Sequence, residues 1–116
     1  MLSDYVMPLE LSVKTDLLIF AAFCDQDESY REHIRSVLEN QIGTNIPFCA
    51  DATAEGMERI RFAVIRLLAE DRLKEEDVVA LAKTDWRDLL IAANFGHDTG
   101  AHSAWYVDVN EHTTRR

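Results

Sequence analysis

The segment from Thr84 to Gly96, TDWRDLLIAANFG, carries a helix start signal, a helix stop signal and an apolar body between them. Thr84 or Asp85 is suited to cap the first turn, and Gly96 is suited to the left-handed conformation that ends a helix. Because little of the body is polar, other elements are expected to enclose this helix. Its predicted core residues are Trp86, Leu89, Leu90, Ala93 and Phe95.

The chain has 116 residues, of which 47% are hydrophobic, and this suits one globular domain over residues 1–116. We expect an all-α fold: a single irregular bundle of five to six helices in which the Thr84–Phe95 helix is central. Four further helices are predicted, at about residues 11–24, 29–42, 53–71 and 75–83, and a last turn or short helix at 101–106. Residues 1–10 read as an irregular N-terminus and residues 110–116 as a frayed tail.

Apolar spacing assigns an inner face to each of the long helices. In the first helix the predicted buried stripe is Val13, Leu17, Phe20 and Cys24. Ser29 with Glu32 forms a capping-box pattern for the second helix, and Gly43 stops that helix. In the third helix Met57, Ile60, Val64, Leu67 and Leu68 share one arc, and opposite them the pairs Glu55–Arg59 and Arg66–Glu70 are typical of solvated surface.

Arg61 interrupts the apolar arc of the third helix. Two interpretations stay open. At an edge position its stem would cover the core while its guanidinium reaches water or an acid such as Asp88. Alternatively, this part of the arc contacts a second subunit or another protein, since arginine is enriched at interface centres.

Acidic residues exceed basic ones, giving a formal charge of −9. Such a charge repels phosphate backbones and anionic lipid, so we expect no nucleic-acid partner and no membrane partner. The excess is concentrated in residues 1–55, with ten acids and three bases. A basic protein partner would meet that half, and the expected contact residues are Asp25, Asp27, Glu28 and Glu32 at the start of the second helix.

The cysteines, Cys24 and Cys49, indicate reduced, packed thiols rather than a disulfide framework. The apolar run that ends at Cys24 resembles a secretory leader only superficially, because residues 1–16 are net negative where a leader needs positive charge. The expected location is therefore cytoplasmic.

Three histidines near the C-terminus, His97, His102 and His112, are weak metal-ligand candidates. Their spacing matches no established zinc motif, so exposed tail histidines are the favoured interpretation and no cofactor is expected. Cys49 is a weak candidate for a nucleophile, because the carboxylate of Asp51 would raise the pKa of its thiol.

Trp105 and Tyr106 follow the last clear helix. They either pack back onto the domain, which is favoured, or form a hot spot for a partner.

These features favour a small acidic, non-enzymatic interaction or adaptor protein, with homodimerisation as an option. One alternative is a metal-dependent or thiol enzyme built on the C-terminal histidines or Cys49. Another is an acidic toxin-neutralising or phage-type inhibitor that imitates the charge of nucleic acid.

Overall fold

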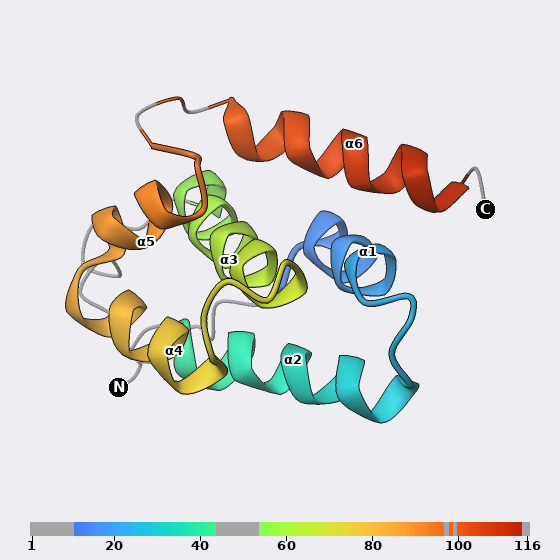
Figure 1. Ribbon diagram of the computed structural model, residues 1–116, viewed down its shortest axis with the longest axis horizontal. Coiled ribbons are helices and arrows are strands. Elements are labelled where there is room, and N and C mark those ends of the chain that lie inside the picture. The colour runs from blue at the N-terminus through green and yellow to red at the C-terminus, as the bar shows by residue number, and fades with distance from the viewer. Residues whose placement is uncertain (1–10, 44–53, 97, 99, 115–116) are drawn as a thin grey trace, which may run out of the picture.

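The computed structural model describes residues 11–43, 54–96, 98 and 100–114. Within those residues it contains six α-helices and no strand, which confirms the all-α prediction (Figure 1). The helices are α1 (Val13–Ala22), α2 (Glu28–Gln41), α3 (Ala54–Ala69), α4 (Glu75–Thr84), α5 (Trp86–Ala92) and α6 (Ala101–Thr114).

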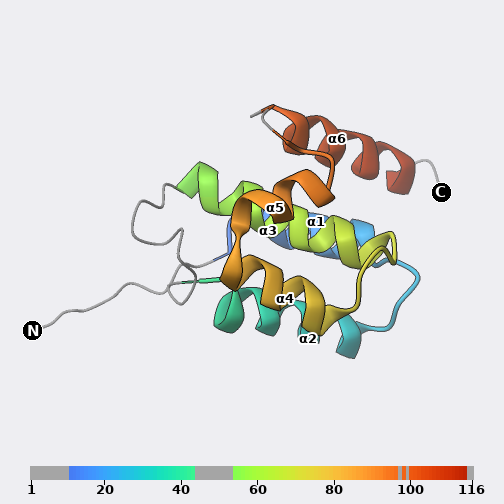
Figure 2. The same ribbon diagram turned by 60° about the vertical axis from the view of Figure 1, so that its left-hand side comes forward.

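The helix at the centre of the bundle is α3. It packs against α1, α4, α5 and α6, and it lies beside α1 in the middle of the molecule (Figures 1 and 2). α6 covers this pair on one side, while α2 and α4 lie on the other side (Figure 2). The expectation that the Thr84–Phe95 helix is central is therefore wrong, because α5 has only 7 residues whereas α3 has 16 and can contact more neighbours.

The core is built around α3 more completely than its sequence pattern predicts. Met57, Ile60, Val64 and Leu67 are buried as expected, and Phe62, Ala63 and Ile65 are buried as well. The predicted residues Leu89, Leu90, Ala93 and Phe95 are also buried, and Trp86 packs against the core at its edge.

Short polar side chains cap the starts of α1, α2 and α5, whereas Lys74 before α4 makes no such hydrogen bond. Ser12 Oγ accepts the amide of Thr15 at the start of α1, and Asp85 Oδ1 accepts the amides of Arg87 and Asp88 at the start of α5. α2 is capped by Asp27, so the predicted Ser29 capping box is wrong, and Ser29 donates to Asp27 instead. The prediction of a start at 51–53 for α3 falls outside the described residues.

Helix α5 ends through a left-handed backbone, as predicted, but two residues earlier than the predicted glycine. Asn94 has φ 65° and Gly96 has φ 44°. The amides of Phe95 and Gly96 both return to the carbonyl of Leu90, which satisfies a carbonyl at the end of the helix.

The C-terminal region is more regular than its sequence suggests. α6 continues through Thr114, so residues 110–114 are helical rather than a frayed tail. Among the described helices none is both long enough and apolar enough to cross a lipid bilayer.

Candidate functional site

The outer face of α1 exposes large apolar side chains. Val13 is 75% exposed, Leu17 is 50% exposed and Phe20 is 56% exposed. The predicted inner stripe of this helix is therefore wrong for these three residues, which face outward, while its fourth member, Cys24, is partly buried just beyond the helix. The residues that face inward are Thr15, Leu18, Ile19, Ala21 and, just beyond the helix, Phe23. We call Val13, Leu17 and Phe20 the α1 apolar stripe.

Phe20 also lines an open groove of about 350 Å³ between α1 and α2. The other lining residues are Asp16, Ile19, Glu28, Arg31, Glu32 and Arg35. Three of the six are acids. This groove joins the α1 apolar stripe to the acidic region that sequence reasoning selected.

Both arginines of this groove are held by the chain itself. Arg35 pairs with Asp16 and with Glu32, at 3.1 Å in each case. Arg31 lies over the Phe20 ring, with 5.3 Å from Cζ to the ring centroid, and donates to the carbonyls of Phe23 and Gln26. Their positive charge is thus partly engaged before any partner arrives.

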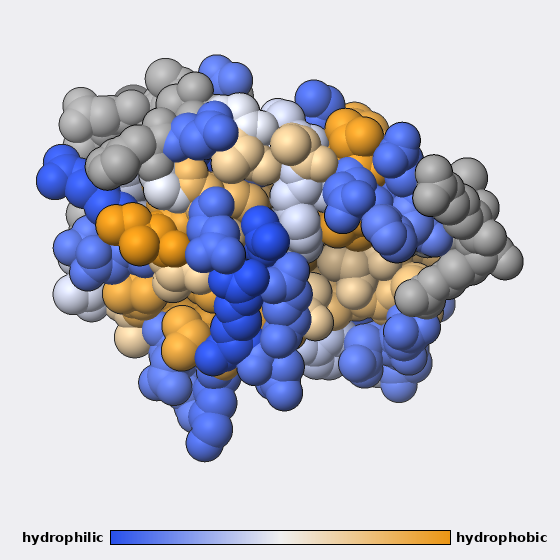
Figure 3. All heavy atoms as spheres, turned by 45° about the horizontal axis from the view of Figure 1, so that its top comes forward, coloured by the Kyte–Doolittle hydropathy of each residue, from blue (hydrophilic) through white to orange (hydrophobic). Residues whose placement is uncertain are grey.

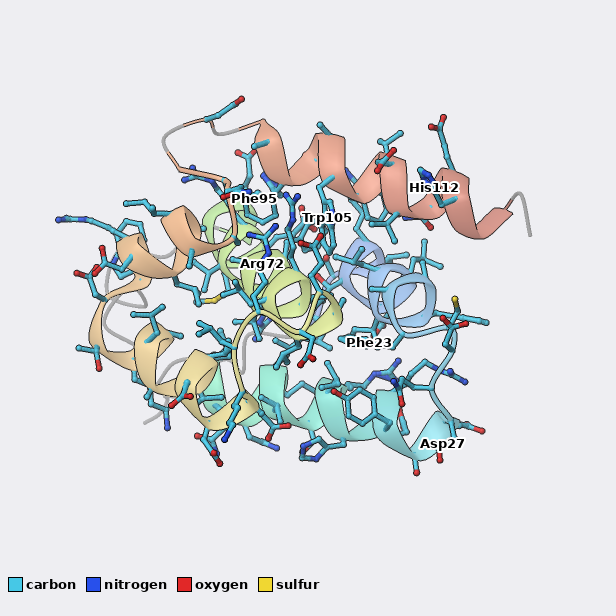
Figure 4. All side chains as sticks on the ribbon, in the orientation of Figure 1. Phe23, Asp27, Arg72, Phe95, Trp105 and His112 are labelled. Atoms are coloured by element: carbon cyan, nitrogen blue, oxygen red, sulfur yellow. The ribbon has the colours of Figure 1, made fainter. Side chains whose placement is uncertain are left out.

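The four predicted acidic contact residues, Asp25, Asp27, Glu28 and Glu32, are all exposed and lie around the start of α2. Asp27 has a second role, because its carboxylate accepts the amide of Tyr30 at 2.9 Å. This hydrogen bond, together with one from the Ser29 hydroxyl, lowers the pKa of Asp27 below its ordinary value. Figure 4 shows Asp27 at the outer end of α2, well away from α6.

Arg61 is buried, at 2% exposure. It therefore lies neither at an edge from which its guanidinium would reach water or an acid such as Asp88, nor on a surface where it would contact a partner. Its Nε donates to the carbonyl of Ile42 at 3.0 Å and its Nη2 to that of Leu38 at 3.3 Å. It therefore caps the C-terminal end of α2, where backbone carbonyls lack helical partners. Burial lowers its pKa to about 10, so the guanidinium is charged at neutral pH.

Trp105 and Tyr106 pack back onto the core from α6, the first of the two interpretations. Trp105 lies 6.1 Å from Phe95 between ring centroids, and the Tyr106 ring stacks on Phe62 at 5.7 Å. Figure 4 shows Trp105 and Phe95 directed into the space between α6 and α3. On the face that carries α6, apolar patches are separated by hydrophilic side chains (Figure 3).

His102 is buried, at 1% exposure, which contradicts its assignment to an exposed tail. Its Nε2 lies 3.9 Å from Oε2 of Glu58, and Glu58 accepts a 2.6 Å hydrogen bond from the hydroxyl of Ser12. The Ser12–Glu58 hydrogen bond links the start of α1 to α3, and His102 places α6 beside Glu58 at a distance too long for a hydrogen bond. Sequence reasoning missed this network, although a serine directly before an apolar helix is a recognisable capping signal.

The other candidates for metal or thiol chemistry lie elsewhere. His112 is exposed and its Nδ1 lies 2.8 Å from the carbonyl oxygen of Asp108, while His97 and Cys49 lie outside the described residues. His102 and His112 are ten residues apart on α6, about 15 Å along the helix axis, and cannot share one ion. Within the described ranges no three His, Cys, Asp or Glu side chains are grouped as metal ligands would be.

A larger groove of about 550 Å³ runs between α2 and α4. Val37 and Val79 supply apolar surface to it. Two contacts link the helices there: His33 Nε2 to Glu75 Oε1 at 2.8 Å, and Lys83 Nζ to Gln41 Oε1 at 2.6 Å. Both contacts connect α2 to α4 at the surface of the molecule.

Comparisons of the chain with protein-family models, with curated proteins and with solved structures gave no match.

Proposed function

We propose that this protein is a non-enzymatic interaction module that binds a basic, amphipathic segment of a partner protein. The binding surface is the α1 apolar stripe together with the groove between α1 and α2. The observation that carries the proposal is the exposure of Val13, Leu17 and Phe20, which lie in helical register on one face.

The α1 apolar stripe supplies the binding energy in this proposal. Fully burying an aliphatic or aromatic side chain contributes about 1.5–3 kcal/mol, and each stripe residue is at least half exposed. Leu18, next to Leu17 in the chain, is fully buried, so the exposure belongs to one face and not to the whole helix. A partner helix that covers this face would gain several kcal/mol, which suits specific association.

The charge around the stripe supports a basic partner. The groove next to Phe20 is lined by Asp16, Glu28 and Glu32 against Arg31 and Arg35, and Arg35 pairs with Asp16 and Glu32. The excess negative charge there comes from Glu28, with Asp25 and Asp27 exposed just before it at the start of α2. The formal charge of −9 opposes self-association of the same face and attracts cationic segments. A basic toxin or nucleic-acid-binding protein belongs to this partner class, so the inhibitor alternative shares this chemistry.

The metal or thiol enzyme alternative has less support from the described geometry. Its histidine set is divided between a buried His102 and an exposed His112, and Cys49 lies outside the described residues. Among the described residues, nothing places His102 and His112 close to each other.

The first experiment measures binding of a synthetic amphipathic peptide with a leucine face and a lysine face by isothermal titration calorimetry. We expect saturable binding that weakens by about tenfold or more in Leu17→Ser or Phe20→Ser, because each removes one apolar anchor. Ile91→Ser is the matched control, since Ile91 is 55% exposed on α5, outside the proposed surface. Equal loss in all three variants would contradict the proposal.

The second experiment tests the charge. The double variant Glu28→Lys, Glu32→Lys is compared with Asp108→Lys, Glu111→Lys, which makes the same charge change on α6. Asp27 is left in place because it caps α2. We expect the α2 variant alone to weaken peptide binding and to flatten its salt dependence. Similar effects from both variants would show nonspecific attraction to an acidic protein.

Sedimentation equilibrium tests self-association as the alternative use of the stripe. The proposal predicts a monomer at micromolar concentration for the wild type. A dimer that Leu17→Ser dissociates would show that a second copy occupies the stripe, and the basic-partner proposal would then be wrong.

A further inference from the structure

An open pocket of about 410 Å³ lies between α3 and α5, on elements that the proposed α1–α2 surface does not use. Its lining residues are Arg59 from α3, Trp86, Arg87, Leu90 and Ile91 from α5, and Gly96 beyond it. Two of the six are arginines and none is acidic. The lining thus carries two positive charges and no carboxylate, in a chain whose formal charge is −9.

Arg87 is held by the neighbouring indole. Its Cζ lies 5.2 Å from the centroid of the Trp86 ring, and within the described part of the chain Arg87 makes no ion pair. A guanidinium is planar and carries its N–H donors in a rigid fork, so contact with an aromatic face leaves these donors able to bind other groups. These donors have the geometry that binds a carboxylate or phosphate with two hydrogen bonds.

Arg59 supplies the second positive charge. The predicted Glu55–Arg59 surface pair is not seen among the ion pairs of the described residues. Instead Arg59 Nη2 donates to the carbonyls of Gly96 at 2.6 Å, Asp98 at 3.3 Å and Phe95 at 3.5 Å. Neutral carbonyls fix the guanidinium at the pocket wall without cancelling its charge.

The acids of the same helix are not part of the lining. Asp85 lies at the start of α5, where its carboxylate accepts the amides of Arg87 and Asp88. Neither Asp85 nor Asp88 lines the pocket.

The remaining lining is apolar. Leu90 is buried, Trp86 is partly buried and Ile91 is 55% exposed. An apolar wall beside two cations suits a ligand with one anionic end and one apolar body, and the volume falls within the range of small-molecule sites.

We propose that this pocket binds a small organic anion. Arg87 and Arg59 hold its carboxylate or phosphate, and Trp86 and Ile91 contact its aromatic or apolar body. The proposal does not depend on the α1–α2 surface. If peptide binding at that surface is disproved, the anion pocket is unaffected, and the reverse also holds.

The test follows the Trp86 indole N–H by NMR in a Trp105→Phe background, where Trp86 is the one remaining tryptophan. The probes are phenyl phosphate, phenylacetate, inorganic phosphate and benzyl alcohol. We expect saturable shifts with phenyl phosphate or phenylacetate, and the tighter of the two identifies the anionic group. Inorganic phosphate and benzyl alcohol should bind at least about tenfold more weakly, because each offers one half of the ligand.

Arg87→Gln should weaken binding of the better probe by about tenfold, since it removes a charged hydrogen-bond donor from an exposed position. Lys74→Gln is the control, because it makes the same charge change at an exposed residue outside the pocket. Unchanged affinity in Arg87→Gln, equal losses in both variants, or equal binding of benzyl alcohol and the organic anions would overturn the proposal.

Discussion

The segment 86–95 and the helix α1 are both mostly apolar, yet they differ in how many of their large apolar side chains are buried. Leu89, Leu90, Ala93 and Phe95 are buried, whereas α1 keeps Val13, Leu17 and Phe20 exposed. In the first segment the exposed positions 87, 88, 91 and 94 recur at helical spacing and mark one outward face. In α1 the polar residues are consecutive, at positions 14–16, and mark no face. The apolar content of a helix thus predicts that it packs against other helices. The spacing of its polar residues predicts which of its faces is buried.

The largest expected effect lies in the enclosed segment. Leu89→Ala should reduce the free energy of unfolding by about 2–5 kcal/mol, because it removes a fully buried side chain and leaves a cavity. Ile91→Ala, two residues later and 55% exposed, should cost less than about 1 kcal/mol. Urea denaturation of both variants checks this. Equal losses would show that segment 86–95 has no distinct inner and outer face.

A smaller effect is expected at Arg61, the charged residue that lies inside the bundle. Arg61→Leu keeps much of the buried volume but leaves the carbonyls of Leu38 and Ile42 without this donor. We expect a loss of about 1–3 kcal/mol in the free energy of unfolding. Arg87→Leu, at an exposed position, should stay within about 0.5 kcal/mol of the wild type. An Arg61→Leu variant as stable as the wild type would contradict the capping role.

The smallest effect is the pH dependence of the α2 cap. The pKa of Asp27 is lower in the folded protein than its ordinary 3.8, so its stabilising contribution is present above that value. The contribution is lost as the pH falls through the lowered folded pKa. Asp27→Asn keeps a capping side chain but cannot titrate there.

The stability advantage of the wild type over Asp27→Asn should therefore shrink on acidification from about pH 5 to below 3.8. Thermal unfolding across this range measures it. An advantage that grows toward low pH would show that the carboxylate is not stabilised in the folded state.

Much of the fold was predictable because strong local signals agree with the packing. The α4–α5 junction at Asp85, the left-handed Gly96 and the buried residues of segment 86–95 all follow from caps and periodicity. The centre of the bundle was not predictable this way, since it depends on which helix contacts the most neighbours.

The candidate sites were harder to predict because they depend on contacts between distant residues. The sequence does not show that the end of α2 packs against Arg61, so Arg61 was placed at an edge. It also does not show that Glu58 lies near His102, so His102 was assigned to the tail. The pocket of Arg59 and Arg87 joins residues 28 positions apart. Its only local signal is an arginine directly after a tryptophan, which is too common to select a site.

Whether α1 presents an exposed apolar face is tested best by urea denaturation of the matched variants Leu17→Ala and Leu18→Ala. These adjacent leucines are 50% and 0% exposed, so the same substitution separates the two faces of α1. We expect a loss of about 2–5 kcal/mol for Leu18→Ala and less than about 1 kcal/mol for Leu17→Ala. A larger loss for Leu17→Ala would show that the stripe is internal, and the proposed interaction surface would not exist.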